Sequence, residues 1–124
     1  ANGWDNTTGG FFDAGYYFND SDTITIINDK KIWWVQAEGL NALLLMSGLY
    51  PEQKNYFQRF TQQWRYINTY MIDHEYGGWF GEGLDNSPGY DQRKKGYDWK
   101  GDYHNFRAML NCIKMLRGES ELLN

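Results

Sequence analysis

The chain has 124 residues, the length of a single domain, and its 16 acidic and 12 basic side chains give a net charge of −4. An acidic chain without a basic stripe is unsuited to bind phosphates, so we expect no nucleic-acid partner. No run approaches the roughly 18 apolar residues of a membrane span, and no signal peptide opens the chain. We therefore expect a cytoplasmic protein with no membrane partner.

Aromatic residues are unusually frequent for so polar a chain. Six Trp, ten Tyr and seven Phe make up 19% of the residues, although the mean hydropathy is −0.76. Flat rings with polar handles suit carbohydrate sites, because the C–H faces of a sugar stack on rings while its hydroxyls find polar partners. An aromatic-rich core explains the composition equally well.

The first recognisable element is one half of an internal repeat. Residues 9–15 (Gly-Gly-Phe-Phe-Asp-Ala-Gly) resemble residues 77–83 (Gly-Gly-Trp-Phe-Gly-Glu-Gly), at an offset of 68 residues. Each Gly pair predicts a tight turn that leads into a short aromatic strand. Residues 23–27, which are rich in Thr and Ile, predict a strand or an extended loop.

Two helices are predicted between the two copies of the repeat. The first begins near Ile32 or Trp33 and ends at Ser47-Gly48; it is apolar almost all the way round, which is typical of an inner helix covered by others. It carries one polar seam, formed by Trp34, Glu38 and Asn41.

The second predicted helix begins at Pro51 and extends to about Asp73. It has one apolar stripe and one polar face, which is typical of an outer helix. The stripe consists of Phe57, Phe60, Trp64, Ile67 and Met71, and the polar face of Gln58, Gln62, Arg65 and Asn68.

A third helix is predicted over residues 103–117, with Asp102 as its N-cap and Gly118 as its stop. Its apolar stripe contains Phe106, Met109, Leu110, Ile113 and Leu116. The single cysteine, Cys112, lies in this helix, and we expect an inert buried thiol.

Alternating inner and outer helices with a Gly-Gly-aromatic turn in each unit are typical of an αα toroid. Six units of 68 residues need roughly 400 residues, so the chain represents about three tenths of a closed ring. The predicted fold class is mainly α: residues 1–124 form the C-terminal part of a single (α/α)6-barrel domain. The missing N-terminal part, or a partner chain, is then needed to complete the fold.

The segment Trp99-Lys100-Gly101-Asp102-Tyr103-His104-Asn105-Phe106-Arg107 carries the strongest indication of chemistry. His104 falls in the first turn of the third helix, where the helix dipole and the charge of Arg107 both favour the neutral imidazole that a general base needs. A histidine that only caps the helix or fills the edge of the core is the plainer alternative.

The polar seam of the first helix should face this segment if the two helices run parallel. A buried Glu38 needs a partner, and Arg107 is the obvious one; the pair could tie the helices together or contact a substrate. Trp33 and Trp34 could supply a stacking platform for a sugar or could simply be core.

Three motifs in this order resemble the N-acylglucosamine 2-epimerase family, and most closely its cellobiose 2-epimerase branch. They are Lys31-Ile32-Trp33-Trp34-Val35-Gln36-Ala37-Glu38, the segment from Asp73 to Phe80, and Trp99-Lys100-x-x-Tyr103-His104-Asn105-x-Arg107. The resemblance covers the chain from Trp4 to about Leu116. It implies an (α/α)6 barrel that epimerises or isomerises a mono- or disaccharide without a cofactor or metal.

The resemblance also implies roles for individual residues. His104 would be one of two histidines that exchange the C2 proton of an open-chain sugar. Trp33 or Trp34, together with Trp99, would line the sugar site, with Glu38 and Arg107 beside them. The second histidine lies upstream in the family, so we expect the isolated chain to be inactive. His74, the only other histidine, is expected in an exposed loop.

Two other classes of function stay open at this stage. A glycoside hydrolase on the same architecture would need two carboxylates roughly 5–10 Å apart, and Asp13, Asp73, Glu82 and Asp85 are available in turns. A non-catalytic carbohydrate-binding remnant is the third class. Asp73-His74-Glu75 does not predict a metal site, because adjacent residues do not converge on one ion.

Overall fold

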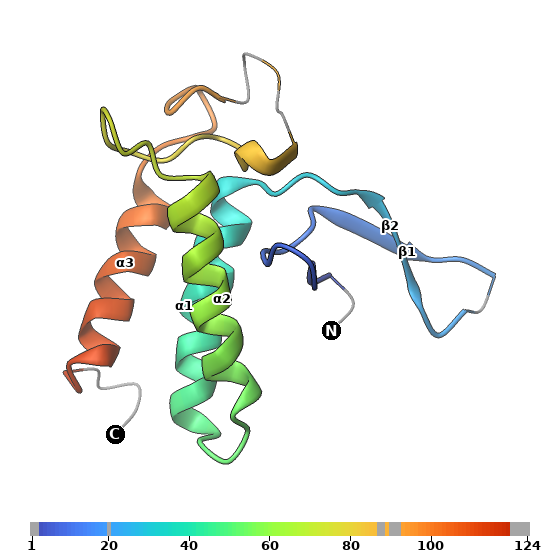
Figure 1. The fold of residues 1–124 in the computed structure, drawn as a ribbon, viewed down its shortest axis with the longest axis horizontal. Coiled ribbons are helices and arrows are strands. Elements are labelled where there is room, and N and C mark those ends of the chain that lie inside the picture. Colours follow the sequence, from blue (N-terminus) through green and yellow to red (C-terminus); the bar gives the residue numbers. More distant parts are fainter. Residues whose placement is uncertain (1–2, 20, 87–88, 90–92, 120–124) are drawn as a thin grey trace.

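The computed structural model describes residues 3–19, 21–86, 89 and 93–119. This part of the chain is mainly helical, with three α-helices lying side by side, a short 3-10 helix (Leu84–Asn86), and a two-stranded hairpin that projects away from the α-helices (Figure 1). None of the helices described is long and apolar enough to cross a membrane.

Helix α1 (Trp33–Leu49) is the central helix and packs against both α2 (Asn55–Tyr70) and α3 (Tyr103–Leu116). Helices α1 and α3 begin at the same end of the molecule, and α2 runs in the opposite direction (Figure 1). The core is formed by Ala37, Leu40 and Leu44 of α1 together with residues of both neighbours, among them Ile67 and Ala108. The prediction of an inner helix covered by others is therefore confirmed.

Helix α2 begins four residues later than predicted, because Pro51 belongs to a turn and not to a helix. The Gln53 amide donates to the Tyr50 carbonyl oxygen at 3.0 Å, which places Pro51 second in a four-residue turn, a position that its fixed φ angle suits. The helix also ends earlier than predicted, at Tyr70, because Ile72 pairs with Trp79 in a β-bridge.

Helix α3 has nearly the predicted bounds, and Gly118 ends it with a φ of 69°. Asp102 occupies the N-cap position, but its side chain makes no capping hydrogen bond. Helix α3 packs on α1 through its smaller residues Ala108 and Cys112, so most of its apolar stripe does not face the core. Four members of the stripe are 39–68% exposed: Phe106, Leu110, Ile113 and Leu116.

The repeat is confirmed as two loops of the same conformation, here called the first Gly-Gly loop (residues 5–10) and the second Gly-Gly loop (residues 73–78). Gly9 and Gly10 have φ angles of 83° and 90°, and Gly77 and Gly78 have 73° and 81°, values that favour glycine. Each loop is closed by one bridge, Trp4 to Phe11 in the first and Ile72 to Trp79 in the second. The first copy leads into the strand Ala14–Tyr17, whereas in the described part of the chain no strand follows the second loop, only isolated bridges.

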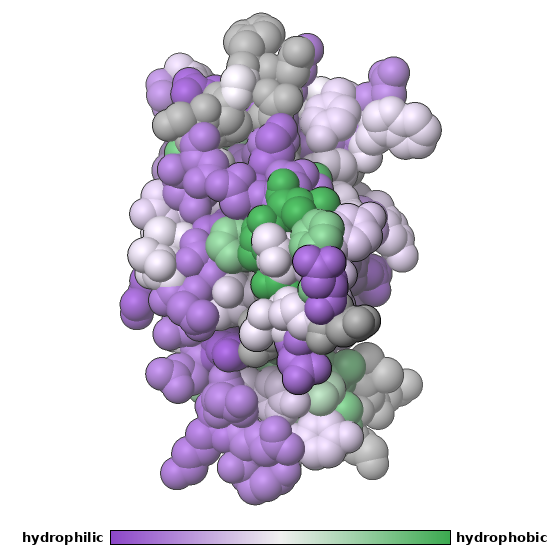
Figure 2. Space-filling view, turned by 90° about the vertical axis from the view of Figure 1, so that its right-hand side faces the viewer, coloured by the Kyte–Doolittle hydropathy of each residue, from purple (hydrophilic) through white to green (hydrophobic). Residues whose placement is uncertain are grey.

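The predicted strand over residues 23–27 corresponds to β2 (Ile24–Asn28), which pairs antiparallel with β1 (Ala14–Tyr17). Viewed from the side of this hairpin, hydrophilic residues cover most of the face, and hydrophobic residues gather in one patch near its centre (Figure 2).

Two buried glutamines join the first Gly-Gly loop to the helices. The Gln36 side chain accepts a hydrogen bond from the Phe11 amide and donates one to the Phe11 carbonyl oxygen, each at 2.8 Å. Gln63 of α2 donates to the Gln36 side-chain oxygen at 3.0 Å and to its backbone oxygen at 3.1 Å. Both side chains are fully buried, and neither was expected from the sequence to make these contacts.

Candidate active site

His104, Glu38 and Arg107 form one cluster between α1 and α3. The Nδ1 atom of His104 lies 2.7 Å from Oε1 of Glu38, and a guanidinium nitrogen of Arg107 donates to the same oxygen. The side chains are 31–38% exposed, so the cluster lies at the edge of the core and not inside it. The predicted pairing of Glu38 with Arg107 is confirmed, and the contact between Glu38 and His104 is an addition to it.

The cluster keeps the Glu38 carboxylate ionised. Partial burial by itself would raise the pKa of this carboxyl, but the hydrogen bonds from His104 and Arg107 outweigh burial and hold the pKa below its usual value. Glu38 in turn raises the pKa of the Arg107 guanidinium. A carboxylate that accepts at Nδ1 fixes the ring so that Nε2 is the nitrogen left for chemistry.

The three tryptophans expected to line a sugar site lie in different environments. Trp34 is 42% exposed, and its ring centroid is 6.1 Å from that of His104. Trp99 is 86% exposed. Trp33 is only 6% exposed and belongs to the core cluster, where its ring packs edge-on against Tyr97 at 5.7 Å, so of the two alternatives Trp34 is the tryptophan open to solvent.

Tyr103 completes the surroundings of His104. The two rings are 5.1 Å apart in an edge-to-face arrangement, and the Arg107 guanidinium lies 5.4 Å from the centroid of the Tyr103 ring.

Asn41, the third member of the polar seam, has a buried side-chain oxygen with no hydrogen-bond partner among the described residues.

An apolar groove of about 480 Å³ extends from Glu38 along the free side of α1. It is open to solvent, and its walls are mostly hydrophobic. The lining residues are Phe11, Asp13, Trp34, Val35, Glu38, Gly39, Ala42, Leu43 and Met46.

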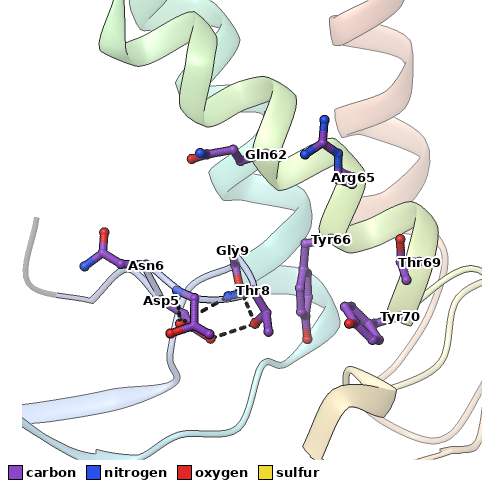
Figure 3. A pocket seen from close by; sticks show the side chains of 10 residues that line it. Asp5, Asn6, Thr8, Gly9, Gln62, Arg65, Tyr66, Thr69 and Tyr70 are labelled. Carbon is purple, nitrogen blue, oxygen red and sulfur yellow. Dashed lines mark hydrogen bonds between the residues drawn. The ribbon is translucent and has the colours of Figure 1, made fainter.

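A second, more polar pocket of about 290 Å³ lies at the first Gly-Gly loop (Figure 3). Asp5 and Thr8 of the loop line one side of it, and Tyr66 and Tyr70 of α2 line the other. None of the residues expected to act on a sugar lines this pocket. Behind it, Asp5, Thr8 and Asp85 surround the fully buried Lys31, so the polar groups already satisfy one another.

The remaining polar groups considered above have structural partners. Asp73 binds Lys95 at 2.8 Å, Glu82 binds Lys30 at 3.4 Å, Asp85 binds Lys31 at 2.8 Å, and Asp13 accepts from Asn28 at 2.7 Å. His74 is exposed, as predicted, with Nε2 at 2.6 Å from the Asn68 carbonyl oxygen. The described residues contain no group of three His, Cys, Asp or Glu side chains that could hold a metal ion.

Cys112 is 4% exposed, as expected of a structural thiol. Burial raises its pKa to about 11, which leaves the thiol protonated and unreactive at neutral pH. The cluster at α1 and α3 therefore presents imidazole, carboxylate, guanidinium and indole groups, and no reactive thiol.

The described part of the chain is mainly helical, and comparison with known proteins shows the family to which it belongs. Residues 1–108 match the family model of N-acylglucosamine 2-epimerase (GlcNAc 2-epimerase). The chain belongs to this family. The matched segment includes Glu38, His104 and Arg107.

Individual relatives include both isomerases and epimerases. The chain is 30% identical over 115 residues to D-mannose isomerase of Marinomonas mediterranea, covering 91% of this chain and 27% of that protein. It is 30% identical over 108 residues to cellobiose 2-epimerase of Dictyoglomus turgidum, covering 85% and 26%. The chain thus spans about a quarter of the length of these relatives.

Solved structures give the same result for the fold. A crystal structure of D-mannose isomerase superposes with a TM-score of 0.69 at 28% identity, covering 94% of this chain and 27% of that one. The cellobiose 2-epimerase of Spirochaeta thermophila gives 0.66 at 32% identity, covering 75% and 23%. The chain is therefore a mainly helical segment that matches about a quarter of an (α/α)6 epimerase or isomerase chain.

Proposed function

We propose that the protein is a sugar 2-epimerase or aldose-ketose isomerase, and that His104 is one of its two proton-transfer residues. The observation that carries this proposal is the hydrogen bond of 2.7 Å between Nδ1 of His104 and the Glu38 carboxylate. It leaves Nε2 of a partly exposed ring available as a base, next to the exposed indole of Trp34.

The reaction proceeds on the open-chain sugar, whose C1 aldehyde acidifies the hydrogen on C2. His104 takes the C2 proton at Nε2, and the electron pair of the C–H bond moves through C1 onto the carbonyl oxygen, giving an enediolate. Return of a proton to the opposite face of C2 gives the epimer, and return to C1, with transfer of the C2 hydroxyl proton to the C1 oxygen, gives the ketose. The relatives include proteins named for each of these outcomes.

Glu38 and Arg107 support the histidine in this mechanism. Glu38 holds Nδ1 and so fixes the tautomer, while it also stabilises the imidazolium that forms when Nε2 accepts the proton. Arg107 shares the same carboxylate oxygen and keeps the Glu38 side chain in place. Trp34 and Trp99 bind the sugar through its C–H faces, without a cofactor.

The second base is supplied from outside these 124 residues. The other histidine of the chain, His74, binds a backbone oxygen in a surface loop and has no place in the reaction. We propose that the chain is the C-terminal part of one (α/α)6-barrel domain, that the rest of the barrel covers the exposed stripe of α3, and that the isolated chain is inactive.

The test is deuterium incorporation at C2 of the sugar in heavy water, measured by NMR on the full-length protein. Replacement of the base, His104→Asn, is expected to lower both this exchange and kcat by about 10²–10⁴-fold. The matched control is His74→Asn, which changes the only other histidine and is expected to leave both rates unchanged. Glu38→Gln should lower kcat less than His104→Asn, because it acts through the ring.

Undiminished exchange in the His104→Asn protein would contradict the proposal. Turnover by the isolated 124-residue chain would contradict the statement that a second base is required. Hydrolysis of a glycoside that survives loss of His104 would favour the glycoside hydrolase alternative instead.

A further inference from the structure

The exposed Trp99 stands at the corner of a tight turn, here called the Trp99 turn (residues 97–100). The Lys100 amide donates to the Tyr97 carbonyl oxygen at 2.8 Å, and the Tyr97 amide donates to the Lys100 carbonyl oxygen at 3.4 Å. A turn closed by this pair of bonds leaves only Asp98 and Trp99 outside the bridge. The position of the Trp99 side chain therefore depends on the positions of Tyr97 and Lys100, which form the base of the turn.

Buried Trp33 forms the floor under the base of this turn. The Tyr97 ring packs edge-on against the Trp33 ring at 5.7 Å, and Nζ of Lys100 lies 5.6 Å from the centroid of that ring. Lys100 is 3% exposed, and burial lowers the pKa of its ammonium group. A buried lysine of this kind needs a fixed acceptor, and Nζ donates to the Lys95 carbonyl oxygen at 2.9 Å.

Lys95 in turn connects the turn to the second Gly-Gly loop. Its Nζ donates to Oδ2 of Asp73 at 2.8 Å and to the Gly77 carbonyl oxygen at 2.9 Å. The contacts therefore form a continuous series from Asp73 through Lys95 to Lys100. The backbone of Lys100 in turn closes the base of the Trp99 turn by its hydrogen bonds with Tyr97. Helix α3 begins three residues after Lys100, at Tyr103, and His104 follows directly.

We propose that Asp73, Lys95 and Lys100 are positioning residues that hold the Trp99 turn and thereby set the place of the Trp99 ring relative to His104. This inference rests on the proposed function, in which Trp99 stacks on the sugar. None of the three lysine and aspartate side chains needs to touch substrate; they act through the position of the indole.

The experiment is a double-mutant cycle on the full-length enzyme, with KM and kcat for the sugar as readouts. Trp99→Ala and Lys95→Met are each expected to raise KM about 3- to 10-fold with kcat changed less than about twofold, the loss that corresponds to one aromatic contact. In the Trp99→Ala background, Lys95→Met is expected to have no further effect, since Lys95 acts only through the ring. Lys95→Arg, which still reaches Asp73, should restore KM.

Two controls separate positioning from general effects. Lys30→Met removes a surface lysine that is 47% exposed and lies 3.4 Å from Glu82, and KM is expected to stay unchanged. Melting temperatures of all variants show whether the assays are made on folded protein; because the Lys95 side chain is 34% exposed, its replacement leaves no buried gap.

The outcomes distinguish this inference from the proposed function. If Trp99→Ala raises KM but Lys95→Met does not, or if their effects add in full, the positioning role is overturned while the sugar contact stands. If Trp99→Ala leaves KM unchanged, the sugar contact of the proposed function fails, and the positioning inference fails with it.

Discussion

The first and second Gly-Gly loops have the same backbone, and their comparison shows what a repeated sequence does and does not fix. In each loop an aspartate accepts hydrogen bonds from backbone amides two and three residues later through Oδ1, and binds a lysine through Oδ2. The distances from Nζ to Oδ2 are 2.7 Å for Lys31 and Asp5 and 2.8 Å for Lys95 and Asp73. The loop and its lysine are therefore one unit that occurs twice.

The surroundings of the two lysines differ. Lys31 has a side-chain exposure of 0%, binds a second carboxylate, Asp85, at 2.8 Å, and lies 4.4 Å from the centroid of the Tyr66 ring. Tyr66 donates to the other oxygen of Asp85 at 2.7 Å, and burial together with this bond raises the pKa of the Tyr66 hydroxyl. Lys95 is 34% exposed and binds one carboxylate among the described residues. We infer that the first loop stabilises the fold and the second positions a turn.

The largest expected effect is that of removing the buried lysine. Lys31→Met leaves two partly buried carboxylates unpaired and is expected to lower the free energy of unfolding by about 3–5 kcal/mol. Lys95→Met should lower it much less, because solvent screens the exposed pair. Urea denaturation of the two full-length variants, followed by far-UV circular dichroism, measures both. Similar losses at the two lysines would contradict the comparison.

A smaller difference is expected between Gly10→Ala and Gly78→Ala. Both residues have positive φ angles, so each replacement costs about 1–2 kcal/mol of stability through backbone strain. A Cβ on Gly10 would also lie 3.0 Å from Cδ of Lys31 and 3.2 Å from the Tyr66 ring, whereas a Cβ on Gly78 would be 3.4 Å from Cδ of Lys95. Gly10→Ala should therefore cost about 1–3 kcal/mol more, and thermal unfolding of both variants tests this order.

The smallest expected effect is on acid stability. Burial opposes ionisation of Asp5, but the bonds from Lys31, Thr8 and Thr7 lower its pKa from 3.8 to about 2; bonds from Lys95 and backbone amides lower that of Asp73 to about 2 as well. A carboxyl whose folded pKa is depressed stabilises the protein above pH 3.8, and this contribution is lost as the pH falls toward 2. For Asp5 it amounts to about 2 kcal/mol.

Measurement of stability between pH 5 and pH 2 tests this last prediction. Over that range, the Asp5→Asn protein is expected to lose less stability than the parent protein, and the effect should be larger than that of Asp73→Asn. The reason is that Asp5 binds the fully buried Lys31, whereas Asp73 binds the partly exposed Lys95. An acid profile of Asp5→Asn parallel to that of the parent protein would show that Asp5 is not coupled to folding. The two variants also serve as controls for each other, since both keep the shape of the side chain.

Most helices and loops could be predicted from the sequence because their causes are local. A nearly continuous apolar run located α1, the periodicity of apolar residues located α3, and the Gly pairs predicted two loops that were confirmed by their positive φ angles. Pro51 was misassigned because proline suits both the start of a helix and the second position of a turn; only the bond from Gln53 to Tyr50 distinguishes them.

The candidate site was predictable in part. His104, Glu38 and Arg107 could be brought together by assuming parallel inner helices, but the bond from His104 to Glu38 depends on the rotation of each helix about its own axis. The choice between Trp33 and Trp34 has the same origin, since adjacent residues point to different sides of a helix. The buried Gln36 and Gln63 escaped notice because, apart from their contact with each other, their partners are backbone atoms, which every sequence contains.

The sequence by itself determined the repeat, the inner helix between two others, the family and the histidine on which the proposed chemistry rests. These follow from local turn conformations, helical periodicity and residue motifs. Only the tertiary structure decided which lysine is buried, which tryptophan is exposed and which face of α3 lacks a cover. The reason is physical: burial and hydrogen-bond partners depend on residues far apart in the chain, as in Lys31, which is held by Asp5 on one side and Asp85 on the other.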